Sequence, residues 1–197
     1  KSIAQQNENT FYFLFEQVFC KIFSIKEFAY ESDEDGENLL HCLARWGSVS
    51  MLKFALEKLK NEFSPEDMQD FIGLKNKNGN NFLHLAAAFS KSKEVFEFLW
   101  MKIEELFEDK EELKKFLLVK GKFERNALLQ SIAQQNENTF YFLFEQVYCK
   151  IFSIKEFAYE SDENGENLLH HLARWGSVSM LKFKLKKLKN EFSPEDL

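Results

Sequence analysis

Proline and glycine are scarce in this sequence, and their scarcity limits the possible folds. The 197 residues contain two prolines and seven glycines. An all-β fold with many tight turns needs more of both, because these residues supply most turn conformations. Lys, Glu, Leu and Phe are common instead, which favours helix, and the hydrophobic content of 45% is enough for a buried core. The composition predicts an all-α protein.

The sequence also lacks a basic excess, a cysteine framework and a long apolar segment. A net charge of -6 and a pI near 5.4 argue against nucleic acid as the main partner, because phosphate binding needs a basic surface. The three cysteines, Cys20, Cys42 and Cys149, form no CxxC pair, so we expect a reducing, cytoplasmic setting. No apolar run reaches the roughly 18–20 residues that span a bilayer, so no membrane insertion is expected.

What the chain does have is internal repetition at two levels. A Leu-rich kernel, as in "GENLLHCLARWG", recurs with its apolar pair starting at Leu39, Phe82, Leu128 and Leu168, at steps of 43, 46 and 40 residues. Residues 131–197 repeat residues 2–68 with six changes: Phe19/Tyr148, Asp35/Asn164, Cys42/His171, Ala55/Lys184, Glu57/Lys186 and Met68/Leu197. The unit is therefore about 43 residues long, and the longer copy spans three units.

These periods predict one repeat array over residues 1–197. The chain opens inside one unit and closes partway through another, so we expect part of a longer array. The expected units are a partial unit at 1–32, full units at 33–75, 76–121 and 122–161, and an incomplete unit at 162–197.

Each unit has the pattern of three helices after a polar turn such as "DEDG". In the first, Leu40, Leu43 and Ala44 share one helical face. A longer second helix follows, for example "VSMLKFALEKLKNEF". The third, shorter helix has explicit start signals: Ser64 precedes Pro65 and two acids, and "SIKE" at 153–156 has the spacing of a capping box.

The kernel resembles the ankyrin repeat. In "NGNNFLHLAAAFS", Leu83, His84 and Ala86 match that family's T-P-L-H-x-A helix, whereas Asn81 and Phe82 stand in place of Thr and Pro. The resemblance implies an α-solenoid of ankyrin-like helix-turn-helix repeats, with a third short helix added to each unit. Units of 40–46 residues exceed the roughly 33 of ankyrin. An armadillo- or HEAT-like array of similar period is the structural alternative.

The histidines and acids suggest chemistry, but a structural interpretation is favoured. His41, His84 and His170 share one repeat position, which in ankyrin-like units orients the turn by hydrogen bonds to backbone; Gln130 takes that position in the unit from Lys122. His170 and His171 are adjacent and point about 100° apart, so they make a poor zinc pair. Pairings of Cys20 with Cys42, or of Cys149 with His171, would be needed for a metal site.

The acids of "ESDEDGENLLHC" match only part of a calcium loop. Its twelfth position holds Cys42 where a bidentate Glu is required, so the acids are interpreted as a solvated turn. No nucleophile elbow, phosphate loop or HExxH pattern is present, so we expect no enzyme activity, no cofactor and no metal.

The resemblance places partner binding on exposed turn tips and first helices. Trp and Arg are favoured interface anchors, although Trp46 could instead pack between units. The copy differences are interpreted as surface changes that avoid the apolar core. The candidate partner-binding residues are Asp33, Glu34, Asp35, Glu37, Arg45, Trp46, Lys77, Asn78, Asn80, Phe89, Asp162, Glu163, Glu166, Arg174 and Trp175.

The expected function is a non-catalytic protein–protein interaction scaffold with a protein partner. Two alternatives remain open: a structural or mechanical spacer, and a regulatory repeat module of a larger channel, toxin or effector. The open ends of the array are expected to expose apolar faces and to allow end-to-end self-association at high concentration.

Overall fold

The computed structural model describes residues 7–19, 24–90 and 92–188. Among these residues the only β pairing is an isolated bridge between Ser161 and Asn167, so the predicted all-α class is confirmed. The helices, in chain order, are α1 (Glu8–Phe13), η1 (Leu14–Phe19), α3 (Ile25–Tyr30), α4 (Leu39–Trp46), α5 (Val49–Lys60), α6 (Pro65–Gly73), α7 (Phe82–Phe89), α8 (Lys93–Leu106), α9 (Lys110–Leu117), η2 (Lys122–Glu124), α10 (Ala127–Ala133), α11 (Glu137–Phe142), η3 (Leu143–Tyr148), α12 (Cys149–Ile151), α13 (Ile154–Ala158), α14 (Leu168–Trp175) and α15 (Val178–Leu188).

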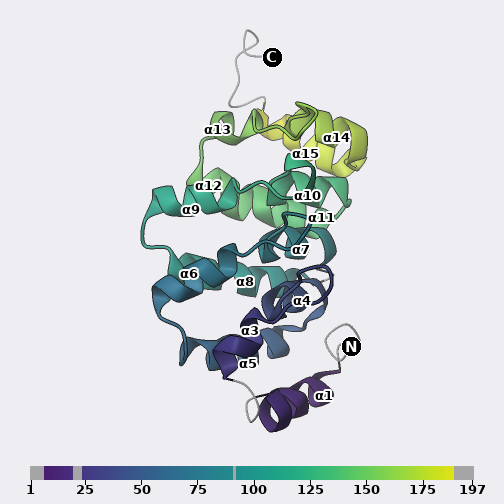
Figure 1. Ribbon diagram of the computed structural model, residues 1–197. Coiled ribbons are helices and arrows are strands. Elements are labelled where there is room, and N and C mark those ends of the chain that lie inside the picture. Colours follow the sequence, from purple (N-terminus) through teal and green to yellow (C-terminus); the bar gives the residue numbers. More distant parts are fainter. Residues whose placement is uncertain (1–6, 20–23, 91, 189–197) are drawn as a thin grey trace.

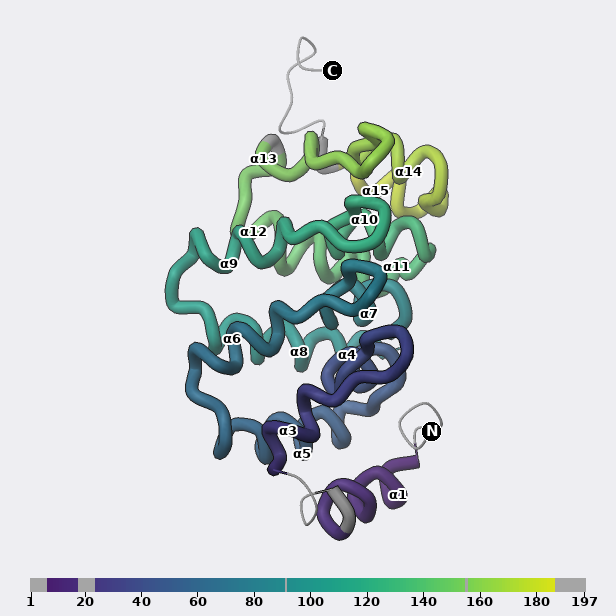
Figure 2. Tube along the Cα trace, viewed as in Figure 1, coloured from purple at the N-terminus to yellow at the C-terminus, as the bar shows by residue number. Residues whose placement is uncertain are grey.

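The helices are arranged in layers that follow one another in chain order (Figure 1). The first helices of successive units form one row, in which α4 packs on α7, α7 on α10 and α10 on α14. The second helices form a parallel row, from α1 and α5 through α8 and α11 to α15. Figure 2 shows the chain rising through these layers from its purple N-terminal helix to its yellow C-terminal ones.

The interior between the two rows is rich in phenylalanine. The rings of Phe96, Phe140 and Phe144 are fully buried, because a second helix has neighbours on both sides. Phe144 meets Phe157 edge to face at 5.6 Å, so the rings interlock helices of the same unit. Tyr148 is also buried, and its hydroxyl donates a hydrogen bond of 2.7 Å to the carbonyl of Leu117. These rings of the second helices therefore form part of the core.

An asparagine caps the N-terminus of each first helix in the described residues. Its side-chain oxygen accepts a backbone N–H from the first turn, which satisfies a donor that has no partner inside the helix. The four caps are Asn38, Asn81, Asn126 and Asn167.

The histidine three residues after this cap links its unit to the next one. Nδ1 of His41 accepts the backbone N–H of Asn38 at 3.3 Å, so its Nε2–H donates to the carbonyl of Asn80 at 3.1 Å. His84 does the same, with Nε2 3.1 Å from the carbonyls of both Val119 and Arg125. We call this arrangement of Asn cap, His and next-unit carbonyl the Asn–His bracket. It confirms the predicted turn-orienting role of these histidines.

The unit that contains α10 has no bracket of its own. Its cap is Asn126, so Leu129 and not Gln130 holds the histidine position. The prediction for Gln130 was therefore wrong by one residue. Other contacts join this unit to the following turn: the Glu163 N–H donates to the carbonyl of Phe123 at 3.1 Å, and Arg125 lies 3.7 Å from the carboxylate of Asp162.

Gly121 fits against the Asn–His bracket of His84. A Cβ at this position would lie 2.7 Å from the His84 ring and 2.4 Å from the side-chain oxygen of Asn80. Only glycine allows the backbone to approach this closely.

The predicted third helices are present with their caps. Ser64 and Ser153 each form a capping box with the acid three residues later. The second helix expected from "NTFYFLFEQVYCKIF" differs, because its centre, η3, is a π-helix between α11 and α12. A π-turn widens the helix locally, and apolar spacing alone does not reveal it.

The Asn–His bracket predicts that a His→Ala substitution destabilises the protein by different amounts in two units. His84→Ala removes the donor to the carbonyl of Arg125 in the next unit and to the carbonyl of Val119, and should lower the free energy of unfolding by about 2–4 kcal/mol. His170 has the same cap contact, but its side chain is exposed, so His170→Ala should cost less than about 1 kcal/mol. Urea denaturation followed by circular dichroism measures both; equal losses would contradict the bracket.

Candidate functional site

The most organised exposed cluster lies where α4 and α7 end. The guanidinium of Arg45 lies 4.4 Å from the ring centroid of Phe89 and 5.9 Å from that of Trp46, and it pairs with the carboxylate of Glu37. The two rings remain 36% and 37% exposed, respectively. We call Glu37, Arg45, Trp46 and Phe89 the Arg45 surface; the structure brings these four predicted residues together.

Burial of Glu37 holds the Arg45 surface in place from beneath. The Glu37 carboxylate accepts hydrogen bonds from Arg45 and, at 3.3 Å, from the side-chain amide of Asn76 in the next unit. Burial raises the pKa of Glu37, whereas the charge of Arg45 lowers it. Arg45 is thus fixed between a buried anion and two aromatic faces, which orders its long side chain before any partner binds.

The later copy forms a looser version of this cluster. Arg174 pairs with Glu166 at 2.6 Å and lies 5.0 Å from the Trp175 ring centroid. Its side chain is 55% exposed, against 24% for Arg45. The difference follows from the neighbour, because no ring equivalent to Phe89 covers Arg174 among the described residues.

The turn tips divide into exposed and buried residues. Six of the predicted residues are exposed at the tips, namely Asp33, Glu34, Asp35, Lys77, Asn78 and Glu163. Their backbones join consecutive turns, as where the Lys77 N–H donates to the Asp35 carbonyl at 2.9 Å.

Three predicted surface residues are buried instead, namely Glu37, Asn80 and Asp162. The expectation that they are exposed was wrong because their side chains hold the turns. The side-chain oxygen of Asn80 accepts the Lys122 N–H at 2.8 Å, and that of Asp162 accepts the N–H groups of Asn164 and Glu166. These buried side chains therefore stabilise the turns that carry the exposed residues.

Sequence reasoning missed an exposed ring at the turn of the third full unit. Phe123 is 44% exposed and lies 5.0 Å from both Lys122 Nζ and the Arg125 guanidinium. Its φ of 60° is in the left-handed region, which few bulky residues adopt. A phenylalanine within the polar turn "KFER" was the available signal.

Two side-chain triads have donor atoms close enough to suggest a metal. Asp33, Glu37 and Cys42 form one, and Asp162, Glu166 and His171 form its counterpart, with donor atoms within 4.8 Å of one another. The same carboxylates already bind backbone N–H groups and arginines, as in the Glu37–Arg45 pair. Burial also raises the pKa of Cys42 to about 11, which disfavours a thiolate ligand. We assign the triads a role in holding the turns.

The geometry does not support a zinc pair of His170 and His171. His170 is exposed and His171 is buried, so the two do not share one site. His171 instead lies with Nε2 3.1 Å from the carboxylate of Asp162, and burial lowers its pKa. Cys20 lies outside the described residues, and the described cysteines, Cys42 and Cys149, are not in disulfides.

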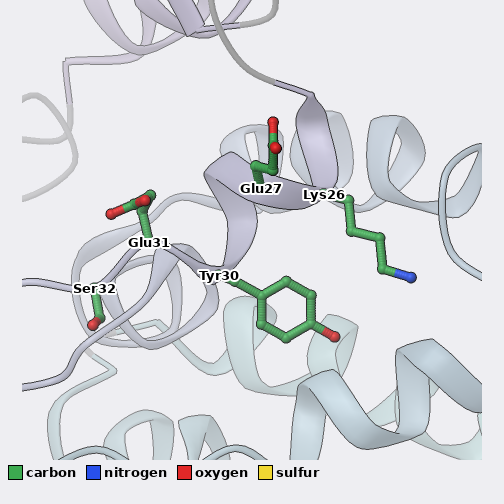
Figure 3. Close-up of a pocket in the computed structure, with 5 residues that line it drawn as sticks. All are labelled: Lys26, Glu27, Tyr30, Glu31 and Ser32. Atoms are coloured by element: carbon green, nitrogen blue, oxygen red, sulfur yellow. The ribbon is translucent and has the colours of Figure 1, made fainter.

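A shallow pocket near α3 offers no convergent chemistry. It is lined by Lys26, Glu27, Tyr30, Glu31 and Ser32. Figure 3 shows these side chains pointing in different directions instead of toward one centre. Within the part of the chain that the structure describes, no helix combines the length and apolar character needed to cross a membrane.

Comparison with known proteins identifies a similar fold but no family. No protein-family model matches the chain, and no curated protein matches it. One similar solved structure is a chain in the crystal structure of the yeast ribosomal protein Rps3 in complex with its chaperone Yar1. The TM-score is 0.59 at 20% sequence identity, over 74% of this chain and 87% of that chain. At this identity the likeness concerns the fold alone.

The two copies differ inside the core as well as on the surface. Lys184 on α15 is fully buried, with its Nζ 4.1 Å and 5.0 Å from the ring centroids of Phe144 and Phe157. Its counterpart Ala55 is also fully buried. The interpretation that copy differences avoid the core was therefore wrong at this position. Burial lowers the pKa of Lys184 to about 7, because the ammonium loses its hydration.

Lys184 should make stability depend on pH. Its folded pKa of about 7 lies below the ordinary lysine value of 10.5, so between pH 7 and 10 the unfolded chain binds a proton that the folded chain does not. The contribution of Lys184 to the free energy of unfolding therefore rises with pH, by up to about 1.4 kcal/mol per pH unit. Lys184→Met, which keeps the volume, should raise the free energy of unfolding at pH 7 by on the order of 1–3 kcal/mol.

The measurement is chemical denaturation of both proteins across pH 7–10. The advantage of Lys184→Met should shrink as the pH rises. The matched control is Ala55→Lys in the earlier copy, which should destabilise the protein most at the low end of this range. If the free energies of unfolding of the parent and of Lys184→Met changed in parallel with pH, this would contradict the lowered pKa of Lys184.

Proposed function

We propose that the chain is an ankyrin-like α-solenoid that acts as a non-catalytic scaffold for binding a protein partner. The observation that carries this proposal is the Arg45 surface: an arginine held between exposed Phe89 and Trp46 rings and neutralised by a buried glutamate. Tryptophan, tyrosine and arginine dominate the energetics of protein interfaces. Fixed rings and a fixed guanidinium lose little conformational entropy on binding.

The repeat geometry also supports a binding scaffold. Helices α4 and α7 end side by side, so the positions of Trp46 and Phe89 form a row across units. The same position is exposed Gln134 in the next unit and half-buried Trp175 in the last. A row of this kind suits an extended protein segment that crosses several units. The similar chain of known structure comes from a complex between two proteins, which is in keeping with this proposal.

The partner expected here has an acidic or polar group beside an apolar side chain. The edge of the guanidinium offers N–H donors to a carboxylate or carbonyl, and the flanking rings offer apolar area. The exposed acids Asp33, Glu34 and Asp35 lie on the neighbouring turn and would disfavour a uniformly acidic partner. We therefore expect a mixed polar and apolar peptide segment as the ligand.

Binding should depend on the rings of the Arg45 surface. Trp46→Ala and Phe89→Ala should each weaken a partner recovered with the parent protein at least tenfold, about 1.4 kcal/mol, in isothermal titration. Met101→Ala is the matched control, because Met101 is an exposed apolar residue on the second helix α8, whereas Trp46 and Phe89 end first helices. Circular dichroism would verify that all three variants fold.

The outcomes separate the scaffold from a spacer. A partner that binds the parent and Met101→Ala equally, but binds both ring variants weakly, supports the proposal. A partner with the same affinity for all four proteins places binding on another surface. The absence of any partner that binds the parent reproducibly would favour a structural spacer.

A further inference from the structure

Because residues 131–197 repeat residues 2–68, the last unit can be compared with its earlier copy in the same chain. Helices α4 and α14 differ at one position only, Cys42 against His171. Yet residues on one face differ in exposure between the copies: Leu40, His41 and Ala44 are buried, whereas Leu169 is half-buried and His170 and Ala173 are exposed. On the second helices, Leu52 is buried and its counterpart Leu181 is half-buried. We call Leu169, His170, Ala173 and Leu181 the end face.

The structure also shows what covers this face in the earlier copy. Helix α4 packs on α7, the first helix of the unit at 76–121. The contact includes the bond from His41 to the Asn80 carbonyl, and the bond from the Lys77 N–H to the Asp35 carbonyl. Alanines at 86 and 87, both fully buried, permit close approach of the two helices.

The copy differences leave the end face intact. None of the six changes falls on Leu169, His170, Ala173 or Leu181. Asn164 lies in the adjoining turn and His171 lies on α14, and neither change removes an atom of the contact seen between α4 and α7. Lys184 and Lys186 lie on α15 but replace none of the four end-face residues. The Asp35 contact uses a backbone carbonyl, which Asn164 retains, and His171 is turned to Asp162 within its own unit.

We propose that the end face is a docking surface for one further repeat unit with the turn and first helix of residues 76–90, joined in cis to the last unit. In this position the His170 Nε2–H would donate to the carbonyl that corresponds to Asn80. The Asn164 carbonyl would accept the N–H that corresponds to Lys77, and a ring at the Phe89 position would cover Arg174. The inference rests on the pairing of α4 with α7 and does not depend on the partner of the Arg45 surface.

The test is to append this repeat unit to the full chain. A copy of residues 69–121 is appended after Leu197, which continues the register because residues 131–197 repeat residues 2–68. A Gly/Ser extension of equal length is the control. We expect amide exchange in α14, measured by mass spectrometry, to slow at least tenfold with the appended unit only. Modification of His170 by diethyl pyrocarbonate should slow in parallel, and buried His171 serves as the internal reference.

Ala173→Arg provides the specificity control. Ala173 is exposed, so this variant should fold like the parent, but an arginine there would block close approach of the added helix. The appended unit should give no protection in the Ala173→Arg background.

Three results would overturn the proposal. The first is no protection by the appended unit, and the second is equal protection with and without Ala173→Arg. The third is protection of α14 in the unextended chain that grows with protein concentration and disappears in Ala173→Arg, because a second copy would then be the occupant.

Discussion

The Asn–His bracket is the contact on which the order of this array depends. The asparagine caps the N-terminus of a first helix. The histidine binds the backbone of that asparagine and also donates a hydrogen bond to a carbonyl of the next unit. His84 is buried so completely that its pKa falls to about 4, so its ring stays neutral and keeps one donor and one acceptor near pH 7. A buried neutral ring with both nitrogens bonded fixes distance and orientation between units.

The surface features follow from this linkage. Because the bracket sets α7 beside α4, Phe89 of one unit reaches Arg45 of the preceding one. Arg174, with the same local sequence, lacks a following ring and stays more exposed. Exposure in this protein is therefore decided by the neighbouring unit as much as by the residue itself, as expected for an array stabilised by nearest-neighbour contacts.

The sequence predicted the parts that depend on local chemistry. The helical class follows from the composition, and the caps at Ser64 and Ser153 follow from short-range patterns. The turn-orienting role of the histidines follows from the resemblance of the kernel to the ankyrin repeat. The missed features depend on packing between units. Apolar spacing could not show that Leu129, and not Gln130, holds the position that histidine takes in other units. It also could not reveal the π-helix η3, because the same side chains point inward in an α-helix and in a π-helix. The stacking of Arg45 on Phe89 requires two residues from different units, and no local pattern contains it.

The most direct test of this account uses the segment that occurs twice in one molecule. Amide hydrogen exchange of the intact chain compares α4, which has a following unit, with α14, whose end face is open. If unit-to-unit contacts hold the array, α4 should exchange at least about a hundredfold more slowly than α14, because it opens only with its neighbours. Equal protection of the two helices would show that each unit is stable by itself, and would contradict the account.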